Sequence, residues 1–338
     1  MTDSLLKPET TSKPQDSRTF QNFLRRVFAI PEVGVLIPLL GFILVFYLIN
    51  PNFLNPDNIA AMVRAMSFTG VVAMGMTFLM ISGAFDLSVG SVAGLGAVVC
   101  SALMVWYHWP IALAVLAGLG TGALVGLVNS FVVLKLGVPA FIATLGMLYI
   151  ARGISYLITK GYTIYPLPDA VNKFGTAEPF NTSWSFIIFV IMAVIFGIIL
   201  ARTAYGRKLY VVGGNPEVAH LAGISPSKIR LSGFVLTGMC AALAGMLFMS
   251  RIVIGNPTTG SGWELNIIAG VVIGGVSLFG GSGSILGAVI GLSIMAVVNN
   301  GLVVSKLDPY WQTVAIGVIM IVAVAIDIVR RKSKTVSL

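Results

Sequence analysis

The stretch SWSFIIFVIMAVIFGIILA, residues 183–201, decides the fold class of this chain. It contains no charged residue, and its length matches the roughly 20 apolar residues that a helix needs to cross the hydrocarbon core of a bilayer. Nine other stretches are similarly apolar, and we expect each to form a membrane-spanning helix: residues 34–50, 59–82, 88–106, 109–134, 138–158, 231–250, 264–279, 284–304 and 309–329. The sequence therefore predicts an all-α integral membrane protein with about ten transmembrane helices.

The composition of the whole chain supports the same class. The 338 residues are 57% hydrophobic and 10% charged, with a mean hydropathy of +0.96, whereas a soluble domain is about 25% charged. Ten spans leave few residues for a water-exposed domain, which argues against a separate catalytic domain. The 38 glycines indicate many closely packed helices, because membrane helices associate through close backbone approach.

The basic residues predict how the chain lies across the membrane. If the N-terminus is cytoplasmic, the predicted cytoplasmic segments hold 15 Lys and Arg and the outer segments hold 4. Basic residues concentrate on the cytoplasmic side of membrane proteins, so we expect both termini there. The net charge of +9 thus does not indicate a nucleic-acid-binding surface. The expected organisation is a cytoplasmic tail at 1–33, a transmembrane domain at 34–329 with a cytoplasmic loop at 203–229, and a basic cytoplasmic tail at 330–338.

Two Gly/Ser-rich segments form a weak internal repeat. Ser88-Val-Gly-Ser-Val-Ala-Gly94 aligns with Gly281-Ser-Gly-Ser-Ile-Leu-Gly287, which pairs Ser91 with Ser284. An odd number of spans separates the two copies, so they would have opposite orientations in the membrane. Inverted repeats with glycine-interrupted helices are a recurring plan of transporters. The alternative is that two Gly/Ser-rich turns match by chance.

Glycines also recur at a spacing of four residues within the predicted spans. Four residues is slightly more than one helical turn, so each set forms a smooth stripe on one helix face. We interpret these stripes as surfaces for helix packing. The three sets are Gly118, Gly122 and Gly126; Gly270 and Gly274; and Gly283, Gly287 and Gly291.

The loop at 203–229 contains signals for a short helix. Asn215 suits the N-cap, Pro216 the first helical position, and Glu217 complements the positive end of the helix. Gly223 suits the left-handed position after the helix. Val218, His220 and Leu221 lie between these signals, and the apolar face with Val218 and Leu221 is too small to fold alone. From the residues alone, docking on the membrane surface and docking on a soluble partner remain equal alternatives.

The motifs in this chain resemble those of the permease subunits of bacterial sugar ATP-binding-cassette (ABC) importers of the ribose/xylose/arabinose type. The resemblance covers about residues 35 to 330, with the motifs in family order. They are ISGAFDLSVGS (81–91), VPAFIATLG (138–146), YGRK (205–208), GGNP (213–216), LAGI (221–224), LNIIAGVVIGG (265–275), GGSGS (280–284) and Trp311-Gln312.

The resemblance implies a transport subunit of the bacterial inner membrane, not an enzyme. A separate cytoplasmic ATPase would bind ATP and Mg²⁺ and contact the loop helix, at about residues 216–222, and a periplasmic binding protein would deliver a monosaccharide or small polyol. A second permease copy, identical or closely related, would complete the pore. This chain contains no G-x-x-x-x-G-K-[ST] phosphate-binding loop, and we expect it to bind no cofactor or metal. Cys100 and Cys240 lie in apolar runs and are interpreted as packing residues.

Polar residues within or beside the spans are candidates for the transport pathway, because polar groups in a membrane are costly. The candidates are Asp86, Ser88, Ser91, Asn129, Thr144, Asn299, Asn300 and Trp311, with Ser130 and Gln312 as further possible sugar contacts. For Asp86 we favour a structural role, capping the following helix, over holding a re-entrant break. Arg64 and Arg152 lie inside spans, where they either reach the headgroups or pair with polar groups.

Three other classes of protein compete with this interpretation. An ion-coupled secondary transporter would also contain inverted repeats, but it usually carries buried acidic residues or histidines within its spans. A membrane enzyme would need a cluster of histidines and carboxylates, and the chain has only His108 and His220. A branched-chain amino-acid ABC permease would need to recognise charged groups, and no motif for that is evident.

Overall fold

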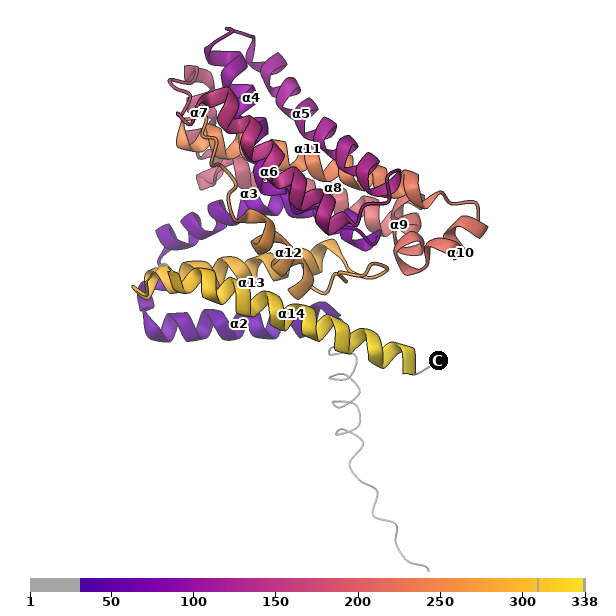
Figure 1. Ribbon diagram of the computed structural model, residues 1–338. Coiled ribbons are helices and arrows are strands. Elements are labelled where there is room, and N and C mark those ends of the chain that lie inside the picture. Colours follow the sequence, from indigo (N-terminus) through magenta and orange to yellow (C-terminus); the bar gives the residue numbers. More distant parts are fainter. Residues whose placement is uncertain (1–30, 309, 337–338) are drawn as a thin grey trace, which may run out of the picture.

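The computed structural model describes residues 31–308 and 310–336, and these residues form a helical bundle (Figure 1). The predicted tail at 1–33 lies almost entirely outside the described residues. Within the described ranges the only β-type pairing is an isolated bridge between Ile164 and Gly255. This part of the protein is therefore all-α, as its hydropathy predicts.

Each predicted apolar run corresponds to a helix. Six of these helices are long and apolar enough to cross a membrane: α3 (Pro56–Ile81), α5 (Ile111–Leu134), α6 (Ala140–Thr159), α8 (Trp184–Arg202), α11 (Pro226–Ile252) and α13 (Ile285–Val304). The other four contain shorter apolar segments: α2 (Pro31–Ile49), α4 (Val89–Val105), α12 (Trp263–Ile273) and α14 (Tyr310–Val336).

The connections contain helices that the hydropathy does not predict. They are α7 (Asp169–Thr176), α9 (Ala204–Gly214) and the 3₁₀ turns η1 (Pro51–Leu54) and η2 (Pro179–Asn181). The short loop helix α10 (Pro216–Leu221) is present as predicted. In Figure 1, α7 lies at one end of the bundle, while α10 and the C-terminal end of α14 lie toward the other.

Most helix boundaries lie within about three residues of the predicted spans, and three differ by more. Helix α12 ends at Ile273 instead of 279, because Gly275 adopts a φ of +90° and turns the chain. Helix α11 begins at Pro226 instead of 231, since Ser225 caps it and Pro fits the first helical position. Helix α14 continues through the basic residues after 329 to Val336. Hydropathy alone marks the apolar part of a helix, not its capped ends.

Helix α11 packs against α3, α4 and α5, and these four helices form the larger of two groups in the bundle. A Cβ atom on Gly122 would lie 2.2 Å from the carbonyl oxygen of Gly238, and one on Gly126 would lie 2.5 Å from that of Phe234. These two glycines therefore let the α5 backbone meet the α11 backbone, which confirms the packing interpretation of this stripe.

The second group contains α2, α12 and α13, and glycines again bring two helices together. Gly274 faces the carbonyl of Gly287, and Gly291 faces that of Gly270. Gly283 is an exception to the predicted stripe: it precedes α13 with a φ of +139° and packs against Val276.

Two non-helical breaks interrupt the bundle, at residues 82–88 between α3 and α4 and at 274–284 between α12 and α13. Helix α4 after the first break is almost fully buried by other helices. Ser88 and Ser284 occupy the positions immediately before α4 and α13, whereas the sequence match pairs Ser91 with Ser284. Because Gly and Ser recur at short intervals in both segments, the sequence alone does not determine which residues of the two segments correspond.

Candidate functional site

The caps of α10 form as the loop sequence predicts. The side-chain oxygen of Asn215 accepts hydrogen bonds from the backbone N–H groups of Glu217 (2.9 Å) and Val218 (3.1 Å). At the other end Gly223 has a φ of +77°, and the N–H of Ile224 donates to the carbonyl of Ala219 at 2.9 Å. These bonds satisfy backbone groups at both ends of a very short helix.

Helix α10 presents apolar side chains to the outside. Ala219 is fully buried, while Val218 is 54% and Leu221 is 87% exposed. Glu217 and His220 are also exposed. The helix is thus anchored by a small residue and leaves its larger apolar side chains uncovered. An uncovered apolar pair on a capped, protruding helix is a surface suited to a partner.

The preceding helix α9 contacts both breaks through a glycine junction, which we define as Gly213, Ile81 and Gly281. The N–H of Gly281 donates to the carbonyl of Ile81 at 2.9 Å. Gly213 packs onto this pair so closely that a Cβ atom there would lie 1.8 Å from the Ile81 oxygen. Only glycine allows this approach of three backbone segments.

Two side chains reinforce the glycine junction. The Nε of Arg230 donates to the carbonyl of Ser82 at 3.0 Å, and the hydroxyl of Tyr210 donates to the carbonyl of Gly283 at 2.7 Å. Arg230 lies on α11 and Tyr210 on α9. The segment that carries α10 is therefore tied directly to both breaks of the bundle.

Asp86 ties the first break to α5. Its Oδ1 accepts hydrogen bonds from the N–H (2.7 Å) and the hydroxyl (2.6 Å) of Ser88, and its Oδ2 accepts one from the amide of Asn129 (3.0 Å). All three side chains are buried. The carboxylate bonds Ser88, the residue before α4, and no backbone N–H of the first turn of α4, so these contacts hold the break and are not the helix cap favoured from the sequence.

The other pathway candidates do not join this network. Thr144 is buried and its hydroxyl donates to the carbonyl of Ala140 in its own helix. Trp311 is 58% exposed. The hydroxyls of Ser91 and Ser130 are buried without a hydrogen-bond partner. Asn299 and Asn300 lie elsewhere, on the wall of a cavity.

This cavity, with a volume of about 340 Å³, lies between α3, α12, α13 and the start of α14. Asn266, Asn299, Asn300 and Gln312 contribute four carboxamides to its wall, and Trp263 contributes an indole. Asn300 and Asn58 exchange two hydrogen bonds, of 2.8 and 2.9 Å. The cavity volume falls in the range of small-molecule sites in proteins.

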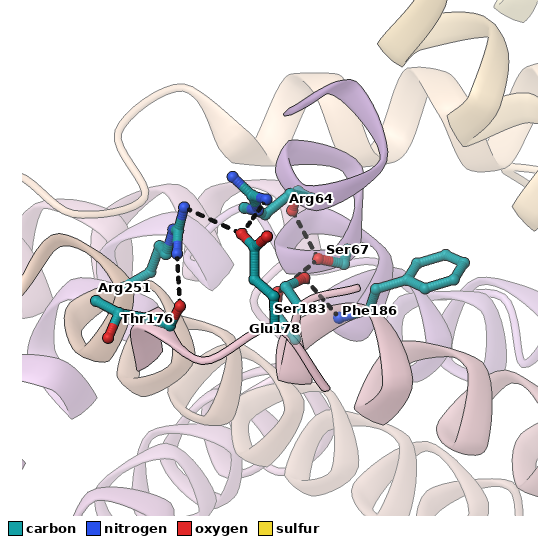
Figure 2. A network of polar contacts seen from close by, with 8 residues as sticks. Arg64, Ser67, Thr176, Glu178, Ser183, Phe186 and Arg251 are labelled. Carbon is teal, nitrogen blue, oxygen red and sulfur yellow. Dashed lines mark hydrogen bonds and ion pairs between the residues drawn. The ribbon is translucent and has the colours of Figure 1, made fainter. Parts of the chain in front are cut away.

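Near the end of the bundle that carries α7, Arg64 and Arg251 converge on one carboxylate, that of Glu178 (Figure 2). Arg64 forms an ion pair with Glu178, and Arg251 lies 3.7 Å from the same oxygen. Arg152 donates to the backbone carbonyls of Pro257 and of Thr259 (2.9 Å). Both arginines therefore pair with polar groups of the protein, which is one of the two alternatives given for them in the sequence analysis.

Several residues of these sites were not predicted from the sequence: Trp263 and Asn266 at the cavity, Asn58 bonded to Asn300 of its wall, Arg230 and Tyr210 at the glycine junction, and Glu178. Their partners are far away in the sequence, so no local pattern links them. Among the described residues, no three His, Cys, Asp or Glu side chains gather where a metal ion could bind.

Comparison with known proteins assigns the class to which this architecture belongs. Residues 58–324 match the model of the family described as the permease component of branched-chain amino acid transport systems. The chain therefore belongs to this family of transport-system permeases, as its motifs suggest. Members of such a family are transport components.

The similar curated proteins are more specific. The ribose import permease protein of Bacillus subtilis (strain 168) is 33% identical over 323 residues, which cover 95% of this chain and 99% of that protein. The L-arabinose transport system permease protein of Escherichia coli (strain K12) is 36% identical over 84% of this chain and 86% of its own. The fructose import permease protein of Rhizobium meliloti is 33% identical, with coverages of 88% and 84%. No solved structure matches the chain.

Proposed function

We propose that this chain is the membrane-spanning permease subunit of an ABC importer that brings a monosaccharide or small polyol into the cytoplasm. The observation that carries the proposal is the match, over nearly the whole chain, to permeases named for the import of ribose, L-arabinose and fructose. The multi-pass helical bundle places the protein in the inner membrane. It is a transport component, and ATP with Mg²⁺ would bind to a partner ATPase.

In this proposal α10 is the contact with the ATPase. Its exposed Val218 and Leu221 offer apolar surface, and fully burying such a side chain contributes roughly 1.5–3 kcal/mol. The carboxylate of Glu217 and the imidazole of His220 are exposed on the same helix. A rigid, capped helix can transmit a push from the ATPase, because its ends do not fray. Substrate would move by alternating access, with no covalent chemistry.

The proposed arrangement has ten spans, with both termini in the cytoplasm and the two halves related as inverted repeats. The basic residues favour this orientation. So does the position of α10 at the same end of the bundle as the C-terminal end of α14 (Figure 1). A second permease copy would complete the pore, and a periplasmic binding protein would dock at the end that carries α7.

Of the pathway candidates, we assign Asp86, Ser88 and Asn129 to holding the first break in place, because their polar groups bond one another. Asn299 and Asn300 remain the candidates for contact with a transported molecule, since they line a cavity. For Ser91, Thr144 and Trp311 a pathway role is a proposal that no contact supports.

The coupling role is tested by breaking α10. Val218→Pro removes the N–H group that donates a hydrogen bond to the side chain of Asn215. We expect this change to abolish sugar-stimulated ATP hydrolysis in the complex reconstituted with its ATPase and loaded binding protein. Val218→Ala keeps that N–H but shortens an apolar side chain of the contact, so we expect a smaller loss, which separates the effect of the helix from that of its surface. Glu217→Ala tests the charge at the helix start. Both the amount of protein in the membrane and basal hydrolysis are recorded. Retained stimulation in Val218→Pro would overturn the coupling role.

The same reconstituted system separates the alternatives. An ABC importer loses uptake when its ATPase is inactivated and keeps it when ion gradients are collapsed. An ion-coupled secondary transporter gives the reverse result. A branched-chain amino-acid permease would transport leucine, and loaded sugar-binding proteins would not stimulate it.

A further inference from the structure

The cavity between α3, α12, α13 and α14 has the chemistry of a binding site. We define the carboxamide cavity as Asn266, Asn299, Asn300 and Gln312 together with the indole of Trp263. These four amides come from three different helices, α12, α13 and α14. Amides from separate helices that face one space form a convergent polar site, because packing alone would be served better by apolar side chains.

The hydrogen bonds within the cavity leave an acceptor unused. The amide nitrogen of Asn299 donates to the side-chain oxygen of Asn266 at 3.2 Å. The Oδ1 of Asn299 is buried and has no hydrogen-bond partner. Buried polar atoms are normally paired, and an unpaired one is costly. This oxygen has no exposed surface, so it accepts a hydrogen bond from a molecule in the cavity once the amide of Asn299 rotates toward that molecule.

The walls also hold these groups in fixed positions. Asn300 is fixed by its two hydrogen bonds with Asn58. Trp263 packs against Phe68 and Phe248, with ring centroids 6.4 and 5.7 Å away. A preorganised wall loses less conformational entropy when a ligand binds.

The lining indicates the class of ligand. Among the described residues that line the cavity, none is charged, so a charged ligand would lose its hydration without gaining a counter-ion. A carboxamide offers both a donor and an acceptor, which is what a hydroxyl needs. The indole and the methionines Met62, Met66 and Met295 supply an apolar wall for C–H groups.

We propose that the carboxamide cavity binds one neutral polyhydroxylated molecule, a monosaccharide or small polyol, during its passage through the protein. This inference rests on the proposed function and adds to it a substrate site within the membrane domain, with Asn299 as its central hydrogen-bonding group. In the proposed orientation the cavity lies toward the outer face, because the first half of α3 and the last part of α13 line it.

The test measures sugar contact directly. The permease–ATPase complex is placed in lipid nanodiscs, and saturation-transfer NMR is recorded with millimolar pentoses, hexoses and polyols, D-ribose, L-arabinose and D-fructose among them. We expect magnetisation transfer to at least one of them in the unaltered protein and none to leucine. Asn299→Leu removes the carboxamide and should weaken the signal roughly fivefold. Ala296→Leu fills the cavity without removing the carboxamide and should abolish the signal.

Two further variants separate binding from folding. Asn299→Gln keeps a carboxamide and should retain the signal. Asn52→Leu makes the same type of change at an exposed asparagine in η1, outside the cavity, and should also retain it. In uptake measurements with the full importer, loss of one hydrogen bond in Asn299→Leu should lower kcat/KM roughly fivefold.

The outcomes distinguish the two proposals. If the importer transports a sugar but the NMR signal is absent, or is unchanged in Asn299→Leu and Ala296→Leu, the cavity is not the binding site and the proposed function stands. If no sugar is transported and no loaded binding protein stimulates hydrolysis, the proposed function itself falls.

Discussion

At the scale of single residues, the buried polar groups of the first break show which hydrogen bonds stabilise the fold. The carboxylate of Asp86 accepts hydrogen bonds from the N–H and the hydroxyl of Ser88 and from the amide of Asn129. The N–H and hydroxyl of Ser88 would lose this acceptor if the carboxylate were removed, whereas the amide of Asn129 also donates to the Ser88 hydroxyl at 3.1 Å. By contrast, the buried hydroxyl of Ser91 has no partner to lose.

This contrast predicts the effect of three substitutions. Asp86→Ala should lower the free energy of unfolding by about 1–3 kcal/mol for each donor left unpaired, while Asp86→Asn should cost less because one carbonyl acceptor remains. Ser91→Ala should be close to neutral. Thermal unfolding of the purified protein in lipid gives the three shifts. Equal losses for Asp86→Ala and Ser91→Ala would show that the network does not stabilise the break.

At the scale of secondary structure elements, the connection between α9 and the two breaks depends on the absence of one side chain. Gly213 contacts the hydrogen-bonded pair of Ile81 and Gly281, whereas a Cβ atom on Gly214 would meet nothing within 4 Å. The two neighbouring glycines therefore make a matched pair for mutation. We therefore expect a side chain at Gly213, but not one at Gly214, to disturb the contact between α9 and the breaks.

We expect Gly213→Ala to reduce sugar-stimulated hydrolysis and uptake sharply, because its methyl group would displace the Ile81 carbonyl and separate α9 from the breaks. Gly214→Ala should keep both activities, since alanine favours a helix. The ratio of stimulated to basal hydrolysis is measured for both variants in lipid. The expectation fails if both variants keep the unaltered ratio, or if both lose it alike.

Sequence signals located some elements and missed others for a physical reason. The caps of α10 are local interactions between Asn215, Pro216 and Gly223, so they could be predicted. Helix α7 is short and packs against α11, and hydropathy gives no sign of it. The early end of α12 at Ile273 depends on a turn that the apolar pattern crosses without interruption.

At the scale of the whole molecule, the orientation in the membrane can be tested at two exposed positions. Tyr162 is 78% and Leu221 is 87% exposed, and the two natural cysteines are buried. In a chain with Cys100 and Cys240 replaced by Ala, Tyr162→Cys should react with a membrane-impermeant maleimide in spheroplasts. Leu221→Cys should react only after lysis. The reverse pattern would invert the proposed topology.

The sequence by itself determined the class of protein, the approximate spans, the family motifs and the capped helix at 216–221. These properties follow from hydropathy, from the distribution of basic residues along the chain and from hydrogen bonds between residues a few positions apart. None of them requires knowledge of which distant segments meet. Polarity predicted the candidates for the transport pathway, but it did not show which of them hold the first break and which line a cavity.

Only the tertiary structure decided which of them meet. Asn299 faces Asn266, Arg64 reaches Glu178, and Gly213 contacts Ile81 and Gly281. Each contact joins elements that are distant in the sequence and depends on how closely whole helices approach. That approach is set by packing summed over many residues, which no local pattern of residues encodes.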